Sequence, residues 1–242
     1  MLDTASPPLA AGDVVILAGG LGTRIRSVLG DTPKLLAPVG QGTLLDFLAA
    51  RLAAQGASRL VLALGHRAEA ITDHLQNRSF PVEVSPIVEP APLGTAGALR
   101  HLRGQLRPGP AIVMNGDTLL DLDLNRLPPR LAQTGAEAVL ACVAVPDAGR
   151  FGRVIVTPDG FIERFAEKGQ SGPGTINAGV YALSPAFLDR VAAGTGASLE
   201  NDFFQTAAPG RLAALPVAGR FVDIGTPEGF AEGARLFGGV DN

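Results

Sequence analysis

The stretch that most constrains the fold is an apolar run that ends abruptly in glycines. Residues 13–17 read Asp-Val-Val-Ile-Leu, and their β-branched side chains are typical of a buried parallel strand. Residues 18–24 follow as Ala-Gly-Gly-Leu-Gly-Thr-Arg. Because Gly19, Gly20 and Gly22 lack a Cβ, the backbone can take positive φ and approach a polyphosphate closely, with successive N–H groups forming an anion-binding nest. The run therefore predicts a strand that leads into a phosphate-binding loop.

Two basic residues flank this loop. Arg24 offers a planar fork to phosphate oxygens, whereas Lys34, which follows Pro33, offers a compact charge. The spacing G-G-x-G-T-R differs from the Walker loop, which ends in Gly-Lys-Ser/Thr, and from the dinucleotide fingerprint G-x-G-x-x-G. A tight strand exit with a surface arginine is the alternative interpretation. The Thr-Arg and Pro-Lys pairs favour phosphate binding.

Strand and helix patterns alternate after the loop. Residues 43–52 carry apolar side chains at helical spacing, with Thr43 as the expected N-cap and Gly56 as the stop. A strand over 60–64 and a helix over 68–75 follow. This β-α-β-α order predicts a parallel sheet with right-handed crossovers.

Two later apolar strands end in a carboxylate. The strand that begins at residue 111 leads to Asp117, and the one that begins at residue 221 leads to Asp223. Open α/β sheets bind ligands at the carboxyl ends of their strands, and Mg²⁺ usually takes one or two carboxylates plus substrate phosphates. Asp117 and Asp223 are therefore predicted metal ligands. Asp121 and Asp123 form a D-x-D pair beyond the strand end, and we interpret them as solvated turn and cap residues.

The middle of the chain predicts an antiparallel extension. Residues 150–156 and 161–165 are strand-like, and Pro-Asp-Gly at 158–160 is a hairpin turn signal. Glu167 and Lys168 follow the hairpin, where a charged rim is the simplest interpretation.

Composition excludes several classes of protein. A chain of 242 residues with 46% hydrophobic and 18% charged residues is typical of a soluble globular protein, and one α/β domain over residues 13–242 accounts for it. Residues 1–12 are expected to form a flexible tail. A net charge of −3 argues against a general nucleic-acid binder. No signal peptide or membrane-span pattern is present, so we expect a cytoplasmic protein without membrane contacts.

The single cysteine, Cys142, lies in an apolar run and is expected to be a buried strand thiol.

Lysine is rare in this chain. Of the 20 Lys and Arg residues only Lys34 and Lys168 are lysine. If surface lysines have drifted to arginine, these two mark places that need a compact ammonium group, and chance survival is the alternative.

The loop G-G-x-G-T-R followed by P-K resembles the signature of the nucleotidyltransferases that join a nucleoside triphosphate to a sugar 1-phosphate. Residues 24–28 and 33–39 are most similar to the D-glycero-α-D-manno-heptose 1-phosphate guanylyltransferases of that family, and residues 198–204 also resemble that branch without indicating a role. Leu35 departs from the pattern, since many relatives have proline there. The resemblance covers about residues 13–237, and no hexapeptide repeats follow.

This resemblance implies a single nucleotidyltransferase domain with a GT-A-like α/β fold. Its Rossmann-like, mainly parallel sheet would be sandwiched by helices, with a small antiparallel sugar-binding part. It implies Mg²⁺ as the cofactor and base recognition by Glu89 and Gly94, in a loop where a stiff turn with Thr95 as helix N-cap is the alternative. The expected residues are Arg24 and Lys34 for catalysis; Leu17, Gly19, Gly20, Gly22, Thr23, Glu89, Gly94 and Thr95 for the nucleotide; Gly152, Glu167, Lys168 and Asn177 for the sugar phosphate; and Asp117 and Asp223 for the metal.

The expected partners are two small molecules, an NTP with GTP favoured and a sugar 1-phosphate with the heptose favoured; a homodimer is compatible with this interpretation. Several alternatives stay open. One is a mannose 1-phosphate guanylyltransferase, or a uridylyl- or thymidylyltransferase for another sugar. A metal-dependent glycosyltransferase would have to use Asp121 and Asp123. A catalytically silent sensor of nucleotide sugars is the third.

Overall fold

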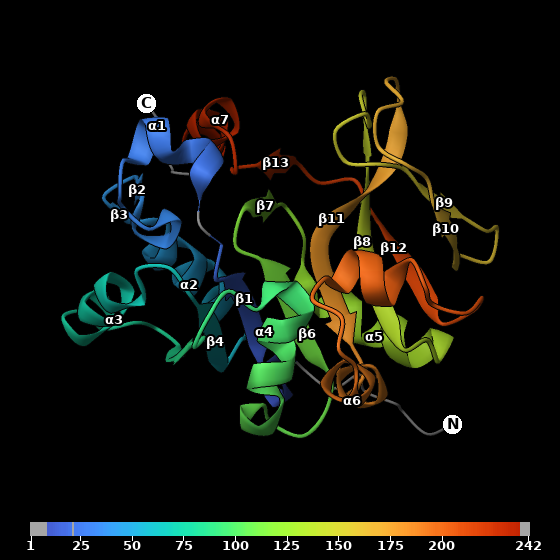
Figure 1. The fold of residues 1–242 in the computed structure, drawn as a ribbon, viewed down its shortest axis with the longest axis horizontal. Helices are drawn as coiled ribbons and strands as arrows, with labels where there is room; N and C mark the ends of the chain where they lie inside the picture. The colour runs from blue at the N-terminus through green and yellow to red at the C-terminus, as the bar shows by residue number, and fades with distance from the viewer. Residues whose placement is uncertain (1–8, 21, 238–242) are drawn as a thin grey trace.

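A seven-stranded sheet forms the centre of the protein (Figure 1). The computed structural model describes residues 9–20 and 22–237. The strand order is β12-β8-β11-β6-β1-β4-β5, and within this sheet only β11 runs antiparallel to its neighbours. The expected mainly parallel sheet is thereby confirmed. The strands are β1 (Val14–Ala18), β4 (Arg59–Leu64), β5 (Glu83–Val88), β6 (Ala111–Asn115), β8 (Ala138–Val145), β11 (Gly174–Leu183) and β12 (Leu212–Val217).

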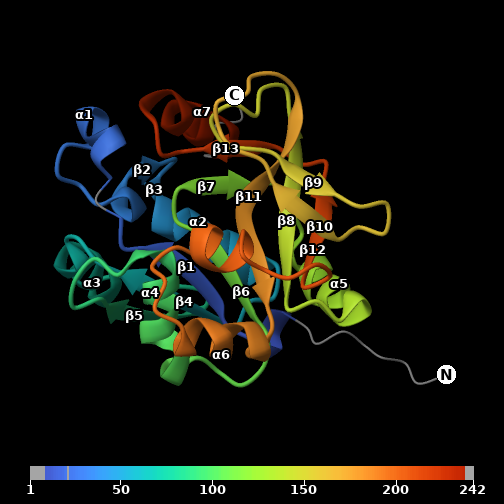
Figure 2. The same ribbon diagram turned by 45° about the vertical axis from the view of Figure 1, so that its right-hand side comes forward.

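Helices cover both faces of this sheet because alternate strand residues point to opposite sides. In β1, Val14 and Ile16 join one core cluster, whereas Val15 joins the other. Figure 1 shows α4 and α6 on the near face, and Figure 2 shows the same layers from another angle. The first cluster includes residues of α2 (Leu44–Ala54), α3 (Ala68–Gln76), α5 (Leu127–Thr134) and α7 (Pro227–Phe237); the second includes residues of α4 (Gly94–Leu102) and α6 (Pro185–Ala193).

Three two-stranded sheets flank the large one. The hairpin of β9 (Val154–Val156) and β10 (Ile162–Phe165) confirms the predicted antiparallel extension. The others pair β13 (Phe221–Asp223) with β7 (Thr118–Leu120) and β2 (Pro38–Val39) with β3 (Gly42–Thr43). Short helical turns complete the described chain: η1 (Leu9–Ala11), η2 (Thr23–Ile25), α1 (Arg26–Leu29), η3 (Lys34–Leu36), η4 (Arg103–Gln105), η5 (Leu124–Arg126) and the π-helix η6 (Leu199–Phe204).

Proline lies in both edge strands of the large sheet. Pro86 is in β5, opposite Leu62, and Pro216 is in β12, opposite Cys142. Proline has no N–H to donate to a further strand and is tolerated at sheet edges for that reason. Each edge is therefore less able to pair with another chain.

Local expectations from the sequence are largely met. Thr43 caps α2 in a capping box with Asp46. Cys142 is buried, and this burial raises the pKa of its thiol to about 12, so the thiol stays protonated. The expected tail differs at its end, because Leu9 lies in the η1 turn with only 4% exposure; residues 1–8 lie outside the described residues. In the described part of the chain, no helix is both long and apolar enough to cross a membrane.

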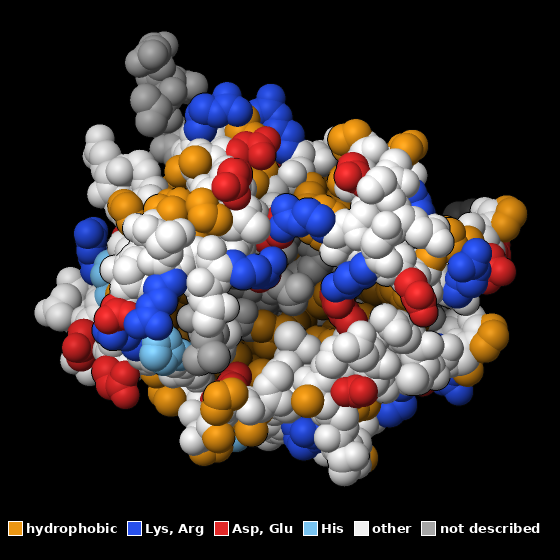
Figure 3. All heavy atoms as spheres, turned by 45° about the horizontal axis from the view of Figure 1, so that its top comes forward, with side chains coloured by type: hydrophobic (Ala, Val, Ile, Leu, Met, Phe, Trp, Pro, Cys, Tyr) orange, Lys and Arg blue, Asp and Glu red, His pale blue; other side chains and the backbone are white. Residues whose placement is uncertain are grey.

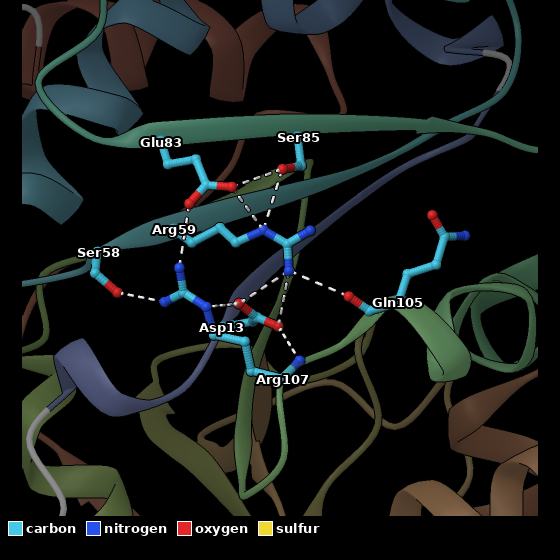
Figure 4. A network of polar contacts seen from close by, with 7 residues as sticks. All are labelled: Asp13, Ser58, Arg59, Glu83, Ser85, Gln105 and Arg107. Carbon is cyan, nitrogen blue, oxygen red and sulfur yellow. Dashed lines mark hydrogen bonds and ion pairs between the residues drawn. The ribbon is translucent and has the colours of Figure 1, made fainter.

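An ion network around the buried carboxylate of Asp13 joins the amino ends of β1, β4 and β5 (Figure 4). Asp13, whose side chain is 1% exposed, accepts a hydrogen bond from the Arg107 backbone N–H at 2.7 Å and lies 3.4 Å from Arg59 Nη1. Both arginines also contact Glu83, at 3.2 and 3.1 Å. Arg107 donates to Ser58 at 2.6 Å. This network ties the segment before β6 to three strand starts.

We predict that Asp13→Asn lowers the free energy of unfolding by about 3 kcal/mol, because it leaves two guanidinium groups beside a neutral buried partner. Chemical denaturation of both proteins measures the difference. Asp189→Asn is the matched control, since Asp189 pairs with Arg103 on the surface with a side chain 65% exposed. The control should cost less than about 1 kcal/mol. Equal costs for the two variants would contradict a special contribution of the buried Asp13 carboxylate.

Candidate active site

Two adjoining cavities open at the carboxyl ends of the parallel strands. The first has a volume of about 640 Å³ and the second about 320 Å³, and Arg24, Asn115 and Asp117 line both. Figure 3 shows a hollow on this side of the molecule, with acidic and basic side chains gathered around it. Every expected nucleotide residue, together with Lys34, lines the first cavity, and every expected sugar-phosphate residue lines the second. Asp223 lines the second cavity as well.

The glycines of the loop differ in what they permit. Only Gly22 has a positive φ, of 60°, so the expectation of positive φ is wrong for the other two. A Cβ on Gly19 would lie 2.8 Å from Glu89 Oε1, whereas a Cβ on Gly20 would meet nothing within 4 Å. Gly19 therefore leaves room for the Glu89 carboxylate. Gly20 borders the open cavity and has no side chain to project into it.

Glu89 lies at the end of β5 with 8% exposure, and Oε2 accepts a hydrogen bond from the Leu93 backbone N–H at 3.3 Å. Burial raises the pKa of this carboxyl above its usual value, and the Leu93 bond offsets part of that rise. A buried acceptor of this kind favours a ligand that brings hydrogen-bond donors.

Helix α4 begins two residues earlier than it would with Thr95 as its N-cap. Its N-cap is Leu93, and Thr95 lies inside the first turn, where its hydroxyl accepts a hydrogen bond from the Leu199 N–H at 2.8 Å. The alternative interpretation, in which Thr95 is the helix N-cap, is therefore wrong. Gly94 has a φ of 74°, and a Cβ there would lie 2.5 Å from the Ala197 carbonyl oxygen. Gly94 and Thr95, which line the nucleotide cavity, thus also contact Ala197 and the first residue of η6.

The pairing of β13 with β7 brings the two predicted metal carboxylates together. Asp223 lies opposite Thr118, and the Ile224 N–H donates to the Asp117 carbonyl at 2.9 Å. A Cβ on Gly225 would lie 2.8 Å from Asp223 Oδ1 and 3.4 Å from Asp117 Oδ2. The glycine therefore leaves a space that both carboxylates border.

Three basic side chains surround this space. Lys34 Nζ lies 3.9 Å and Arg24 Nη2 lies 3.6 Å from Asp117 Oδ2, and Arg150 Nη2 lies 2.7 Å from Asp223 Oδ2. Burial lowers the pKa of Lys34, and the Asp117 charge partly offsets this effect. Arg150 was not identified from the sequence; its place two residues before Gly152 in one loop is the signal that could have indicated it.

The donor set fits a hard divalent cation that also binds substrate. Among the described residues no group of three or more His, Cys, Asp and Glu side chains is arranged to hold a metal alone. Two carboxylates that border one space suit Mg²⁺, which completes its shell with phosphate oxygens and water. Because Arg150 occupies one oxygen of Asp223, a bound cation would have to share or displace that contact.

The second cavity combines basic and acidic side chains. Glu167 and Lys168 line it and are exposed, and Gly152 has a φ of 80°. A Cβ on Gly152 would lie 2.9 Å from the Ala166 carbonyl oxygen, so the glycine permits the close approach of the segment that carries Lys168. Glu200 also lines this cavity, and the sequence assigned it no role.

The D-x-D pair lies outside both cavities. Asp121 is 65% exposed and pairs with Arg51 at 3.1 Å, and Asp123 caps η5 by accepting from the Asn125 N–H at 3.0 Å. Both are the turn and cap residues that the sequence predicts, which disfavours a glycosyltransferase that depends on this pair.

Comparisons with known proteins agree with this geometry. The profile of the family described as "Nucleotidyl transferase" matches residues 13–237. The D-glycero-alpha-D-manno-heptose 1-phosphate guanylyltransferase of Aneurinibacillus thermoaerophilus is 30% identical over 92% of this chain and 97% of its own length. The mannose-1-phosphate guanylyltransferase of Mycobacterium tuberculosis is 31% identical over 92% of this chain and 63% of its own length. The crystal structure of HddC from Yersinia pseudotuberculosis complexed with GMP-PN has a TM-score of 0.80 at 33% identity, covering 93% of this chain and 99% of that chain.

We predict that Asp117→Asn and Asp223→Asn each lower kcat by on the order of 100-fold. Each substitution removes an anionic ligand from the bound cation, which stabilises the charge of the transition state by several kcal/mol. Binding of Mn²⁺, followed by electron paramagnetic resonance, should weaken in both variants.

Asp121→Asn is the control, since it makes the same change in an exposed residue of the neighbouring loop. Its kcat and Mn²⁺ affinity should match the wild type. Near-normal turnover of Asp117→Asn or Asp223→Asn at saturating Mg²⁺ would refute that residue as a metal ligand.

Proposed function

The chain belongs to the nucleotidyl transferase family, and we propose that it joins GTP to a sugar 1-phosphate, with D-glycero-α-D-manno-heptose 1-phosphate favoured, to give a nucleotide sugar and pyrophosphate. The observation that carries this proposal is the meeting of two cavities at Arg24, Asn115 and Asp117, one lined by the expected nucleotide residues and the other by the expected sugar-phosphate residues. The names of the heptose relative and of the GMP-PN complex support the choice of sugar and base.

The chemistry requires positioning and charge neutralisation. An oxygen of the sugar 1-phosphate attacks the α-phosphorus of GTP in line, a new P–O bond forms, and the bond to the β-phosphate oxygen breaks as pyrophosphate leaves. The phosphate dianion is already nucleophilic, so no general base is needed. Arg24 and Lys34 would neutralise charge on the triphosphate, because both lie within 4 Å of Asp117 where the cavities meet. Asp117 and Asp223 would hold Mg²⁺, which supplies further neutralisation on the phosphates.

Guanine recognition is assigned to Glu89. Guanine presents two neighbouring donors, N1–H and the N2 amino group, whereas uracil presents one donor between two carbonyls. A buried carboxylate with free acceptor capacity matches the first pattern. Gly19 makes room for this carboxylate in the nucleotide cavity.

We propose a cytoplasmic enzyme, since nucleoside triphosphates are available there. The homodimer stays a prediction from the sequence. The relative from Mycobacterium tuberculosis supports mannose 1-phosphate as the second candidate sugar.

A panel of four nucleoside triphosphates and several sugar 1-phosphates, scored by pyrophosphate release, tests this function. We expect release with GTP and D-glycero-α-D-manno-heptose 1-phosphate to exceed every other pair. A higher rate with mannose 1-phosphate would select the second candidate. Nucleotide-sugar binding without turnover of any pair would indicate a sensor instead.

We predict that Glu89→Gln lowers kcat/KM for GTP by about 10- to 150-fold, the equivalent of roughly 1.5–3 kcal/mol for charge-assisted hydrogen bonds. The glutamine amide would also direct a donor at the donors of guanine. The loss with UTP should be smaller, and rates with both triphosphates at equal Mg²⁺ measure the difference. An equal loss for every base would eliminate guanine recognition through Glu89.

The raised pKa of Glu89 adds a pH dependence. As pH falls through this raised pKa, the carboxyl gains a proton and ceases to accept from guanine, so kcat/KM for GTP falls at a higher pH than an ordinary glutamate would cause. The ratio of wild type to Glu89→Gln isolates this titration, because substrate phosphates titrate equally in both assays. The ratio should decrease toward acid pH, and a constant ratio would contradict the prediction.

A further inference from the structure

A bulge in β11 shapes the second cavity. The pairing of β11 with β8 shifts register between Asn177 and Tyr181, and Gly179 inside this break has a φ of 71°. The Gly179 N–H donates to Asn177 Oδ1 at 3.0 Å, and a Cβ on Gly179 would lie 2.8 Å from Asn115 Nδ2. Bulges re-aim side chains next to active sites, and here the bulge directs Asn177 into the cavity lining.

The Asn177 amide is already saturated as a donor. Nδ2 donates to Tyr181 Oη at 3.0 Å and to Glu200 Oε1 at 3.2 Å, which uses both of its hydrogens. The Gly179 N–H needs an acceptor, so Oδ1 must face it, which fixes the orientation of the amide. Tyr181 is 1% exposed, and its hydroxyl is neutral because burial raises its pKa. Asn177 therefore has no hydrogen left to donate to a sugar.

Glu200 has the acceptor capacity that Asn177 lacks. It comes from η6, a π-helix of the kind often found at functional sites, and its half-buried side chain lines the second cavity. Two hydrogen bonds hold the start of this helix: Ser198 Oγ accepts from the Asn201 N–H, and Thr95 Oγ1 accepts from the Leu199 N–H. A carboxylate offers about four acceptor sites, and the contact with Asn177 uses one of them.

Several carboxylates line the second cavity, and they differ in whether a basic side chain lies beside them. Asp117 lies beside Arg24, Asp223 lies beside Arg150, and Glu167 directly precedes Lys168 in the sequence. Glu200 differs from these carboxylates, because it lies on an element that carries no basic residue and accepts from the Asn177 amide. Phosphate is repelled by a carboxylate, but sugar hydroxyls are donors that a carboxylate accepts. The cavity therefore suits a ligand whose anionic end meets the basic side chains and whose hydroxyl-rich end meets Glu200.

We infer that Glu200 accepts hydrogen bonds from hydroxyl groups of the sugar 1-phosphate and that Asn177 is a positioning residue that holds this carboxylate. The inference rests on the proposed function and deepens it, because it assigns sugar specificity to a side chain outside the expected set. It also changes the expected role of Asn177 from direct sugar contact to support.

The test compares wild type with Glu200→Gln, which keeps the shape of the side chain and the bond from Asn177 but removes the charge. We expect kcat/KM for the sugar 1-phosphate to fall by about 10- to 150-fold, the loss of a charge-assisted hydrogen bond. KM for GTP should change by less than about twofold, since Glu200 lies outside the nucleotide cavity. Glu200→Asp keeps the charge and should restore part of the loss.

Glu163→Gln is the matched control, because Glu163 is an exposed glutamate of β10 outside both cavities. It should behave as wild type. A series of monodeoxy sugar 1-phosphates gives a readout that a structural role would not move. Removal of the hydroxyl that Glu200 contacts should lower kcat/KM of the wild type. The same removal should lower kcat/KM of Glu200→Gln only slightly, because that variant has already lost most of the contact.

The outcomes separate the two levels of the proposal. A wild type that turns over no sugar 1-phosphate would overturn the proposed function and this inference together. An active wild type with an equally active Glu200→Gln would overturn the inference alone. If both Glu200 variants lost kcat/KM equally for GTP and for the sugar 1-phosphate and had a lowered Tm, Glu200 would have a structural role. That result would also overturn the inference.

Discussion

The short antiparallel pairing of β13 with β7 is the constraint on which the candidate site depends. It places the strand that ends in Asp223 beside the strand that starts after Asp117, and the Ile224 N–H donates to the Asp117 carbonyl at 2.9 Å. Without this pairing the two carboxylates would belong to unconnected parts of the chain. Gly225 then leaves open the space between them, where a side chain would lie within 3.4 Å of both.

Charge balance around this pair explains the basic residues nearby. Two carboxylates in a partly buried space repel each other, and Arg24, Lys34 and Arg150 each lie within 4 Å of one of them. The same cations suit phosphate groups, so they can offset the negative charge that a phosphate ligand would add beside the two carboxylates. Burial of Lys34 lowers its pKa, and an incoming phosphate would favour its charged form.

Several residues support the shape of the site without taking part in its chemistry. Thr95 accepts from the backbone of η6, Asn177 donates to Glu200, and Gly94 allows the Ala197 carbonyl to approach. At the opposite ends of the strands, the Asp13 network fastens the starts of β1, β4 and β5. Ion pairs thus fasten the amino ends of these strands, and the carboxyl ends are left open for ligands. Ligand binding at the carboxyl ends of the strands is expected for an open, mainly parallel sheet.

The sequence by itself determined the mainly parallel sheet, the hairpin, the glycine loop and the two carboxylates at strand ends, because periodicity and strand endings are local properties of the chain. Tertiary structure decided what each residue contacts. Thr95 bonds Leu199 across 104 positions, and Arg150 bonds Asp223 across 73, and no local pattern encodes such pairs. The same holds for Gly19, whose missing side chain makes room for Glu89 rather than for a positive φ. A helix cap such as Thr43 can be predicted from the chain. Which neighbouring residue occupies the space beside a glycine follows only from how the strands pack together.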